Sequence, residues 1–279
     1  MSNYETKRPM LALQGLRCEL GKPGNNDRFR LVIQELMLYA GQLLCVFGPT
    51  GIGKSTLLRL LGLAQKPTSV ETFLILERIG SFLPEKIHDI AHLWRKSRQA
   101  DIARLRLRLL AFALQFPELF PSLTVRENIE IPLRLNNIRV NPEELADLLR
   151  ALSCSPDDLD LFQRQHYRPH QLSGGQKQRA GLGRAFVHRP KLLLADEPTS
   201  NLDRETAKRA MDVINHLRST YGTAVILVSH DESLARDYAD RIIRLEKDAH
   251  GYSTIVEEEQ ITPCHDEDFG SGLLEEMES

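Results

Sequence analysis

The sequence is poor in the features that mark secreted and membrane-spanning proteins. Its four cysteines, Cys18, Cys45, Cys154 and Cys264, lack the spacing of a metal site or a redox pair. They are therefore expected to be reduced structural thiols in a cytosolic protein. Residues Met1 to Arg8 lack the apolar centre of a signal peptide, and no apolar stretch approaches the roughly 20 residues that span a bilayer. A function at a membrane would therefore need membrane spans from another chain.

An excess of basic residues is also absent. Lys and Arg number 36 against 38 Asp and Glu, so the formal net charge is -2 and no nucleic-acid partner is expected. Charge is uneven locally, because Arg95 to Arg108 holds six basic residues against one acid, Asp101. The stretch from Gly251 to Ser279 holds nine acids and no Lys or Arg, a composition compatible with a disordered tail. Runs of this kind are most often solvated surface.

The hydrophobic content of 42% suffices for a sizeable core, and 279 residues suit one large α/β domain. Partial alternation predicts two antiparallel strands, Met10 to Leu20 and Phe29 to Leu38, joined by a turn at residues 21–26. Leu43 to Phe47 is a continuous apolar run, which is typical of a strand buried on both faces. Helical periodicity follows from Ser55 to Ala64.

Further along the chain, apolar runs alternate with helical patterns, which predicts a mainly parallel sheet covered on both faces. The expected strands are Phe73 to Leu76, Leu109 to Leu114, Leu192 to Glu197 and Ala224 to His230, and the expected helices include Pro84 to Arg108, Leu145 to Leu152 and Glu205 to Thr220. Residues 116–170 have a helical pattern broken by prolines, and we interpret them as an inserted helical subdomain. The predicted organisation is one domain over residues 1–250 and an acidic tail over residues 251–279.

A glycine-rich loop separates the strand that ends at Phe47 from the helix that starts at Ser55. Strand, glycine loop and helix in this order form a phosphate-binding loop, whose backbone N–H groups wrap phosphate oxygens beside the helix N-terminus. Lys54 is expected to reach the β- and γ-phosphates of a nucleoside triphosphate, and Ser55 to bind Mg²⁺. The alternative is a chance glycine turn, which the flanking strand and helix make improbable. The candidate phosphate-binding residues are Gly48, Pro49, Thr50, Gly51, Ile52, Gly53, Lys54, Ser55 and Thr56.

Two adjacent carboxylates, Asp196 and Glu197, end a predicted buried strand. Magnesium in nucleotide sites is usually bound by one or two carboxylates together with substrate phosphates, and Asp196 fits that role. Glu197 is then placed to orient or deprotonate the attacking water. Taken alone, such a pair is more often a surface feature. The phosphate loop favours a functional interpretation, because the carboxyl ends of parallel strands converge on one crevice.

The stretch Leu172-Ser173-Gly174-Gly175-Gln176 precedes a helical run from Gln178 to Val187. Two glycines at a helix start leave unpaired N–H groups accessible, and such an end attracts an anion. The Ser173 hydroxyl adds a further donor. An ordinary helix start is the alternative, but the stretch lies between the phosphate loop and the acid pair.

The phosphate loop, the Leu172 to Gln176 stretch and the acid pair, in this order, resemble those of the ATP-binding-cassette (ABC) ATPases. The resemblance runs from about Met10 to Glu246. It implies a P-loop NTPase core, an N-terminal antiparallel β subdomain and an inserted helical subdomain, with ATP and Mg²⁺ as ligands. It also implies that two copies sandwich ATP, each offering its phosphate loop to the other copy's Ser173, Gly174, Gly175 and Asp203.

The same resemblance assigns roles to residues that would be weak candidates alone. Gln115 resembles the glutamine that contacts Mg²⁺ and the attacking water, and His230 resembles the switch histidine that contacts the γ-phosphate. Asp203 lies in Ser200-Asn201-Leu202-Asp203, which resembles the loop that crosses the dimer interface. Without the family, a lone glutamine at a strand end is usually structural, and a lone histidine in a loop is usually solvated.

The sequence from Phe120 to Leu133 is similar to the sequences of one branch of the family, which holds lipoprotein-release, macrolide-efflux and cell-division ATPases. This similarity implies a permease-type integral membrane partner and a peripheral location on the cytoplasmic face of the cell membrane. A non-transport ATPase that regulates a cell-division or envelope complex is the competing function. The family's groove for a helix of the membrane partner corresponds to Phe116, Pro117, Leu119 and Phe120, although core packing explains any one of these residues equally well.

One departure from the family concerns adenine. An aromatic residue on the first hairpin usually stacks on the base, but alignment puts Leu20 near that position. Phe29, across the turn, is a possible substitute. Without stacking, adenine would be held by apolar contact alone, so we expect reduced ATP affinity and weakened selectivity for the base.

Overall fold

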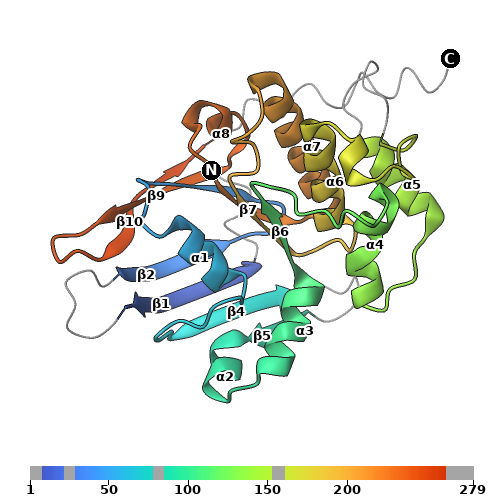
Figure 1. Cartoon of the computed structure of the whole chain (residues 1–279). Helices are drawn as coiled ribbons and strands as arrows, with labels where there is room; N and C mark the ends of the chain where they lie inside the picture. The colour runs from blue at the N-terminus through green and yellow to red at the C-terminus, as the bar shows by residue number, and fades with distance from the viewer. Residues whose placement is uncertain (1–7, 22–28, 78–84, 153–160, 262–279) are drawn as a thin grey trace.

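The computed structural model describes residues 8–21, 29–77, 85–152 and 161–261. Ten strands within these ranges form one mixed sheet in the order β5-β4-β1-β2-β10-β9-β3-β8-β7-β6 (Figure 1). The mixed sheet with its covering helices confirms the predicted α/β class. Several predictions fall wholly or partly outside the described residues: those for Met1 to Arg8, the turn at residues 21–26, Cys154, Cys264 and the part of the tail over residues 262–279.

One part of the sheet is antiparallel. β1 (Leu11–Leu20) pairs with β2 (Phe29–Leu38) along almost its whole length. On the other side of β1, the sheet continues into β4 (Thr72–Glu77) and then β5 (Lys86–Asp89). The apolar residues of β1 and β2 that face the core are fully buried, which explains the partial alternation seen in the sequence.

The other part is built on parallel strands. β3 (Leu43–Phe47), β8 (Ala224–Val228), β7 (Leu192–Asp196) and β6 (Leu110–Leu114) are parallel neighbours in that order. β9 (Arg241–Lys247) lies parallel to β3 on its other side. Every residue of β3 and β8 is buried, as expected for strands covered on both faces.

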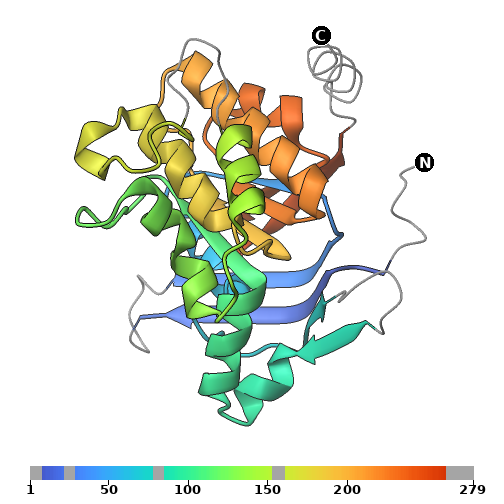
Figure 2. The ribbon, with the colours of Figure 1, turned by 90° about the vertical axis from the view of Figure 1, so that its right-hand side faces the viewer.

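Helices cover the two faces of these parallel strands (Figure 2). One face carries α1 (Lys54–Leu61) and α3 (Gln99–Leu109), while α2 (Ile90–Arg95) lies against β4 of the antiparallel part and against α3; the three helices share a core with Leu192 and Leu194 of β7. The alternate residues Leu193 and Ala195 face the second core. That core is built with α4 (Val125–Leu135), α5 (Pro142–Ala151), α6 (Gly174–Phe186), α7 (Arg204–Tyr221) and α8 (Glu232–Tyr238), and a short 3₁₀ turn at Pro169–Gln171 precedes α6. None of these helices, within the described residues, has the length and apolarity needed to cross a bilayer.

The prediction that Pro84 to Arg108 is mostly helical was partly wrong. This stretch begins with the edge strand β5, which pairs only with β4 and is too short to show a period of its own. Asp89 then caps α2, accepting a hydrogen bond from the backbone N–H of His92 at 2.8 Å. The one acid of the basic run from Arg95 to Arg108, Asp101, forms ion pairs with Arg98 and Arg104 at the surface of α3.

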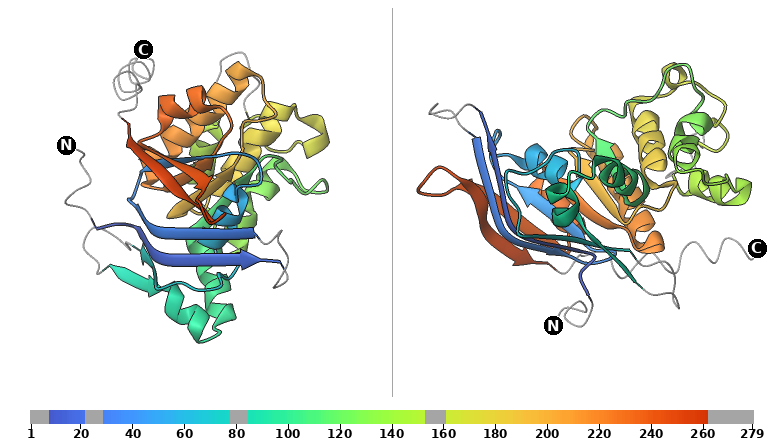
Figure 3. Two further views of the ribbon diagram at one scale, coloured as in Figure 1. Left: turned by 90° about the vertical axis from the view of Figure 1, so that its left-hand side faces the viewer. Right: turned by 90° about the horizontal axis from the view of Figure 1, so that it is seen from below.

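The interpretation of residues 251–279 as a disordered tail was wrong for its first part. Residues Ser253–Gln260 form β10, which pairs antiparallel with β9 and lies between β9 and β2 (Figure 3). The acidic side chains of β10 meet bases on neighbouring elements. Glu258 pairs with Arg241 at 2.9 Å, and Glu259 pairs with Arg236 of α8 at 2.9 Å. Cross-strand pairs of opposite charge favour the strand, so an acidic composition alone did not predict disorder here.

Candidate nucleotide-binding and hydrolysis site

Four candidate residues lie at one edge of the sheet. Because β3, β8, β7 and β6 are adjacent and parallel, the segments that follow them emerge together. Gly48 follows β3, His230 follows β8, Glu197 follows β7 and Gln115 follows β6. The register matches Leu114 with Asp196 and Asp196 with Val228, so these strands end level with one another.

The phosphate loop has the backbone conformation that a phosphate cradle requires. Gly53 is the N-cap of α1, with φ of 109°, and its position has no side chain to cap the helix. The first N–H groups of α1 therefore lack the side-chain acceptor that caps most helices. A turn formed by Ile52 N–H donating to the Pro49 carbonyl, at 3.2 Å, holds the loop in shape. The loop thus presents donors at a positive helix end.

Lys54 is buried and lies across this loop. Its Nζ donates to the carbonyl oxygens of Gly48 at 2.6 Å and Pro49 at 3.2 Å. Burial lowers the pKa of Lys54, and the negative charges of Glu197 and Asp196 partly oppose this effect. The ammonium group thus donates to two backbone carbonyls and interacts electrostatically with both carboxylates.

Ser55 and Thr56 are the next two residues, and they differ in exposure. Ser55 is exposed at the first turn of α1. Thr56 is buried, and its hydroxyl oxygen accepts a hydrogen bond from Arg59 at 3.2 Å. Ser55 is therefore the hydroxyl that is accessible to a ligand, whereas Thr56 has a partner within the protein.

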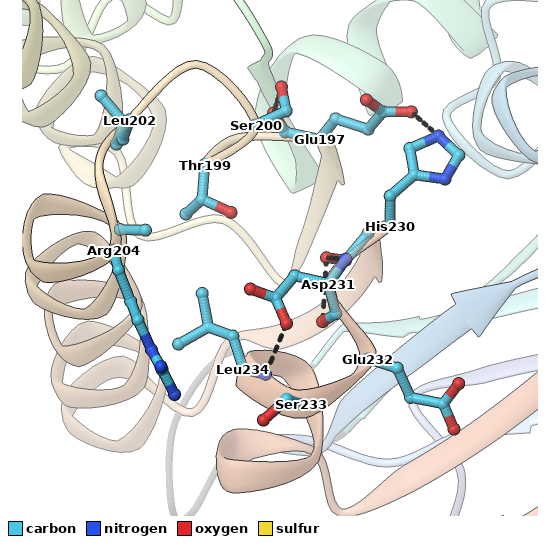
Figure 4. A pocket seen from close by; sticks show the side chains of 12 residues that line it. Glu197, Thr199, Ser200, Leu202, Arg204, His230, Asp231, Glu232, Ser233 and Leu234 are labelled. Atoms are coloured by element: carbon cyan, nitrogen blue, oxygen red, sulfur yellow. Dashed lines mark hydrogen bonds and ion pairs between the residues drawn. The ribbon is translucent and has the colours of Figure 1, made fainter.

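Glu197 and His230 form a direct pair (Figure 4). Nε2 of His230 lies 2.7 Å from Oε1 of Glu197. Glu197 has φ of 50°, a left-handed conformation that is uncommon for a residue other than glycine. Its N–H donates to the Val228 carbonyl at 3.0 Å, which fixes the peptide against β8. Strain of this kind persists where the surroundings fix it and is frequent at functional sites.

A cavity of about 760 Å³ opens beside this pair. Its walls come from the loop after β7 and from the loop that leads from β8 into α8 (Figure 4). The second loop is tied at its base, because the N–H of Asp231 donates to the Ser229 hydroxyl at 3.1 Å. The side chains that line the cavity include Glu197, Thr199, Ser200, Leu202, Arg204, His230, Asp231 and Glu232.

Ser173, Gly174 and Gly175 form the start of α6. The Ser173 hydroxyl oxygen accepts a hydrogen bond from the Gln176 N–H at 3.2 Å, and the Gln176 side chain accepts one from the Ser173 N–H at 3.0 Å. This capping box leaves the hydroxyl hydrogen of Ser173 free to donate. Open space surrounds Gly174, whereas a Cβ on Gly175 would lie 2.8 Å from Cγ2 of Thr206 on α7. Gly175 is therefore required by the packing of α6 on α7.

Asp203 begins α7 in the same layer of helices. Its carboxylate accepts hydrogen bonds from the Thr206 N–H at 3.0 Å and from the Thr206 hydroxyl at 2.7 Å. These hydrogen bonds, the hydroxyl's first, lower the pKa of Asp203. The structure therefore gives Asp203 a capping role within its own chain.

The predicted site residues do not all lie on the same face of the parallel strands. α1 lies on one face of the parallel strands, whereas α6 and α7 lie on the other. Lys54, Asp196 and Glu197 are within electrostatic reach of one another, and Glu197 contacts His230. Among the described residues, no hydrogen bond or ion pair joins Ser173, Gly174, Gly175 or Asp203 to the phosphate loop.

Leu20 and Phe29, the two candidates for contact with adenine, are cross-strand neighbours. Leu20 is 39% exposed, which leaves its side chain open to a ligand. Phe29 is part-buried, and its ring covers Gly53, where a Cβ would come within 2.4 Å of Cζ. An apolar surface thus lies directly beside the phosphate loop.

Two charged residues near the site, Glu232 and Arg244, were not predicted from the sequence. Glu232 lines the cavity with His230, and Arg244 forms an ion pair with Glu232. A signal was present, because Arg244 interrupts the apolar residues Ile242, Ile243 and Leu245 of β9. A charge retained in such a strand usually has a specific partner.

Comparisons with known proteins agree with this geometry. A family model described as ABC transporter matches residues 33–200. The chain is similar to the lipoprotein-releasing system ATP-binding protein LolD of Legionella pneumophila (strain Paris), with 36% identity over 213 residues that cover 76% of this chain and 84% of that protein. It is also similar to an uncharacterized ABC transporter ATP-binding protein, YvcR of Bacillus subtilis (strain 168), with 35% identity over 79% of this chain and 77% of that protein.

A solved structure shares the fold as well. The dimeric MJ0796, a bacterial ABC transporter cassette, matches with a TM-score of 0.68 and 25% identity over 91% of this chain and 99% of that chain. A second structure of MJ0796, in a post-hydrolysis state bound to ADP and Pi, matches with a TM-score of 0.65. The resemblance drawn from the sequence is therefore confirmed. The chain belongs to the ABC transporter family, in which it is an ATP-binding subunit that hydrolyses ATP.

Proposed function

We propose that two copies of this chain bind two ATP molecules at their mutual interface and drive a separately encoded membrane partner. The division of the candidate site between two faces of the sheet is the observation that carries this proposal. Lys54, Glu197 and His230 lie at the strand ends, whereas Ser173 and Asp203 begin helices of the opposite layer. A second copy brings its own Ser173 and Asp203 to the phosphate loop of the first.

Mg²⁺ fits the residues at this edge. Among the described residues there is no cluster of three or more His, Cys, Asp or Glu side chains that could hold a metal on its own. Mg²⁺ in nucleotide sites is bound by one or two carboxylates together with phosphates, so it does not need such a cluster. The exposed Ser55 hydroxyl, the Asp196 carboxylate and the Gln115 amide are oxygen donors of the right kind. When bound, the ion would neutralise phosphate charge.

The chain's own residues then divide the work of hydrolysis. Lys54 and the N–H groups of residues 48–56 bind and orient the phosphates. Glu197 accepts the proton of the attacking water or orients it, and Gln115 helps to position that water. His230 fixes the Glu197 carboxylate through the 2.7 Å contact. In the proposed complex it also contacts the terminal phosphate. Phe29, beside Gly53, supplies apolar contact for the base.

A membrane partner is supported by the apolar surface near Gln115. Phe116 and Phe120 are 65% and 53% exposed, so core packing does not account for them. Exposed aromatic residues of this kind suit an apolar helix lying in a groove. The LolD relative is named for a lipoprotein-releasing system. We therefore infer a permease-type partner and a peripheral location on the cytoplasmic face of the cell membrane.

Substitution of Glu197 by Gln tests the proposal. The amide keeps the shape and binding contacts of the carboxylate but does not accept a proton, so the ATP-bound dimer should accumulate. Size-exclusion chromatography with light scattering should give a dimer for Glu197→Gln with ATP and Mg²⁺, and a monomer without nucleotide. The double variant Lys54→Ala/Glu197→Gln is the matched control and should remain monomeric. A Glu197→Gln protein that stays monomeric with ATP at micromolar concentration counts against the proposal.

The partner is tested with the same trapped variant. Tagged Glu197→Gln protein is incubated with detergent-solubilised host membranes, with and without ATP, and the bound proteins are identified by mass spectrometry. An integral membrane protein with few spans and a large extracytoplasmic domain supports the lipoprotein-release, efflux or cell-division branch. A partner with many spans indicates a conventional transporter, and recovery of only soluble proteins contradicts the membrane role.

A further inference from the structure

Arg244 of β9 lies against the strand that carries the phosphate loop. It is the register partner of Phe47, the last residue of β3. Its guanidinium carbon lies 5.6 Å from the centroid of the Phe47 ring, within the range of a cation–π contact. Phe47 is buried in the same core as Ala235 and Tyr238 of α8. The stacked guanidinium therefore lies where β3, β9 and α8 meet.

The same guanidinium holds the start of α8. Arg244 pairs with Glu232, which is the first residue of α8 and lies two positions after His230. Arg244 also pairs with Glu257 of β10 at 2.8 Å. Hydrogen bonds from Arg244 first, and from Arg236 second, lower the pKa of Glu232. Glu232 is thus an ionised anchor that receives two arginines from different elements.

Only one of these two arginines connects Glu232 to β3, the strand that carries the phosphate loop. Arg236 lies one turn further along α8 itself and pairs with Glu232 at 2.9 Å. Its second partner is Glu259 of β10, and the pairs that the described residues show for Arg236 do not include a residue of β3. Arg244 alone, among the described residues that pair with Glu232, also stacks on Phe47. The Glu232 carboxylate therefore pairs with two arginines, of which Arg244 also contacts β3 and Arg236 also contacts β10.

Both segments that Arg244 joins belong to the site. Phe47 is followed directly by Gly48, where a Cβ would lie 2.6 Å from the carbonyl oxygen of Leu245, the neighbour of Arg244. On the other side, Glu232 lines the cavity that also contains Glu197 and His230, and Figure 4 shows its side chain pointing away from Leu234. A movement of α8 relative to β3 would thus change the distance between His230 and the phosphate loop.

We propose that Arg244 is a positioning residue for ATP hydrolysis, which fixes the His230 segment relative to the phosphate loop by joining Glu232 to Phe47. This inference rests on the proposed roles of His230 and Glu197. The contacts need a planar, bidentate cation, because one face of the guanidinium stacks on the ring while its N–H groups reach two carboxylates. Lysine keeps the charge but does not reproduce that geometry.

If Arg244 served only to stabilise the fold, its loss would lower kcat and the thermal unfolding temperature together. The pairs of Arg244 are partly exposed, and ion pairs of this kind contribute little to global stability. A small misplacement of a catalytic group, by contrast, can reduce the chemical rate about 100-fold. Loss of Arg244 should therefore cause a large fall in kcat but only a small fall in the thermal unfolding temperature.

The test compares Arg244→Gln with Arg236→Gln, which removes the other arginine from the same carboxylate. We expect Arg244→Gln to reduce kcat for ATP about 10- to 100-fold with the KM for ATP unchanged. Arg236→Gln should leave both values unchanged, and Arg244→Lys should restore part of kcat. Without nucleotide, hydrogen exchange over residues 229–238 should be faster in Arg244→Gln than in Arg236→Gln. Glu232→Gln combined with Arg244→Gln should lower kcat no further than Arg244→Gln alone.

Glu197→Gln separates failure of this inference from failure of the proposed function. If Glu197→Gln hydrolyses ATP like the unmodified protein, the proposed hydrolytic roles are wrong. If Glu197→Gln is inactive but Arg244→Gln and Arg236→Gln behave alike, the role of Arg244 is wrong and the proposed function stands. A loss of kcat in Arg244→Gln that is matched by a large fall in unfolding temperature also contradicts positioning, because it indicates general loss of structure.

Discussion

The start of α1 and the start of α6 are both predicted to contact ATP phosphates, yet they are built in opposite ways. α1 begins at Gly53, which has a left-handed conformation and offers no side chain as a cap. α6 begins at Ser173, which closes a complete capping box with Gln176. A cation, Lys54, lies across the first end, whereas the second begins with Gly174 and Gly175 and has no acidic residue in its first turn.

This difference indicates which end depends on a ligand. The uncapped end of α1 leaves its first N–H groups without side-chain acceptors, so bound phosphate is their natural partner. At the capped end of α6, the N–H groups of Ser173 and Gln176 already have acceptors within the chain. It keeps only the Ser173 hydroxyl hydrogen and the open backbone of Gly174 for an outside contact. Such an end suits a surface offered to the nucleotide of a second copy.

Removal of the cation should have the largest effect. Lys54→Ala deletes the charge expected to hold the terminal phosphates, and hydrogen bonds to charged groups are worth about 1.5–3 kcal/mol each. We expect ATP affinity measured by calorimetry to fall about 100-fold or more. Lys66→Ala is the control, because Lys66 donates to the Trp94 carbonyl and lies outside the loop. Unchanged ATP affinity in Lys54→Ala would remove α1 as the primary phosphate site.

Substitution of Ser173 separates capping from phosphate contact. Ser173→Asp keeps a side-chain acceptor for the Gln176 N–H but replaces the donor with a negative charge. We expect unchanged stability, unchanged ATP binding by the monomer, and at least about tenfold weaker ATP-dependent dimerisation. Analytical ultracentrifugation of the Glu197→Gln background measures the dimerisation. Ser173→Ala should instead lose about 1 kcal/mol of stability. Normal dimerisation of Ser173→Asp would contradict a role in trans.

Gly174 and Gly175 provide a smaller test of the same helix end. Gly175→Ala should destabilise the fold by about 1–2 kcal/mol in urea unfolding, because the new methyl group meets Thr206. Gly174→Ala meets nothing and serves as the control. Thr206→Ser removes the obstructing methyl group but keeps the hydroxyl that donates to Asp203, so it should restore the stability of Gly175→Ala. Equal stability of the two single variants would refute the packing argument.

A pH titration gives the smallest expected effect. The pKa of Lys54 is lowered from its ordinary 10.5 by burial, so this cation loses its proton earlier than an exposed lysine as pH rises. ATP affinity should therefore be constant near neutral pH and decline as pH rises toward 10.5 from below. The α6 end uses a hydroxyl and amides, which do not titrate in this window. Calorimetry should show the decline for binding to the monomer, and a flat profile would contradict it.

Residues that act through local backbone were predictable. The phosphate loop, the acid pair at the end of β7 and the glycines before α6 are consecutive stretches whose order identifies the family. The strands buried on both faces were equally readable, because Leu43–Phe47 and Ala224–Val228 are continuous apolar runs. The location of Gln115 and His230 after strand ends followed from the same runs. Their roles came from the resemblance, since neither residue is distinctive alone.

Residues that act through pairing between distant segments were not predictable. β10 was assigned to a disordered tail because Glu257, Glu258 and Glu259 suggest a solvated run. The bases that accept these acids belong to β9 and α8, and sequence composition does not reveal which strand lies opposite. The same limit hid the contact of Arg244 with Phe47, which lies nearly two hundred positions earlier in the sequence.

By itself, the sequence determined that this chain is an ABC ATPase. Phosphate binding uses backbone N–H groups of consecutive residues, and their conformation depends on the local order of glycine, lysine and serine. The tertiary structure alone decided that α1 and α6 lie on opposite faces, that His230 contacts Glu197, and that β10 joins the sheet. These features depend on strand order and register, which arise from packing free energy summed over the whole core rather than from any short stretch of residues.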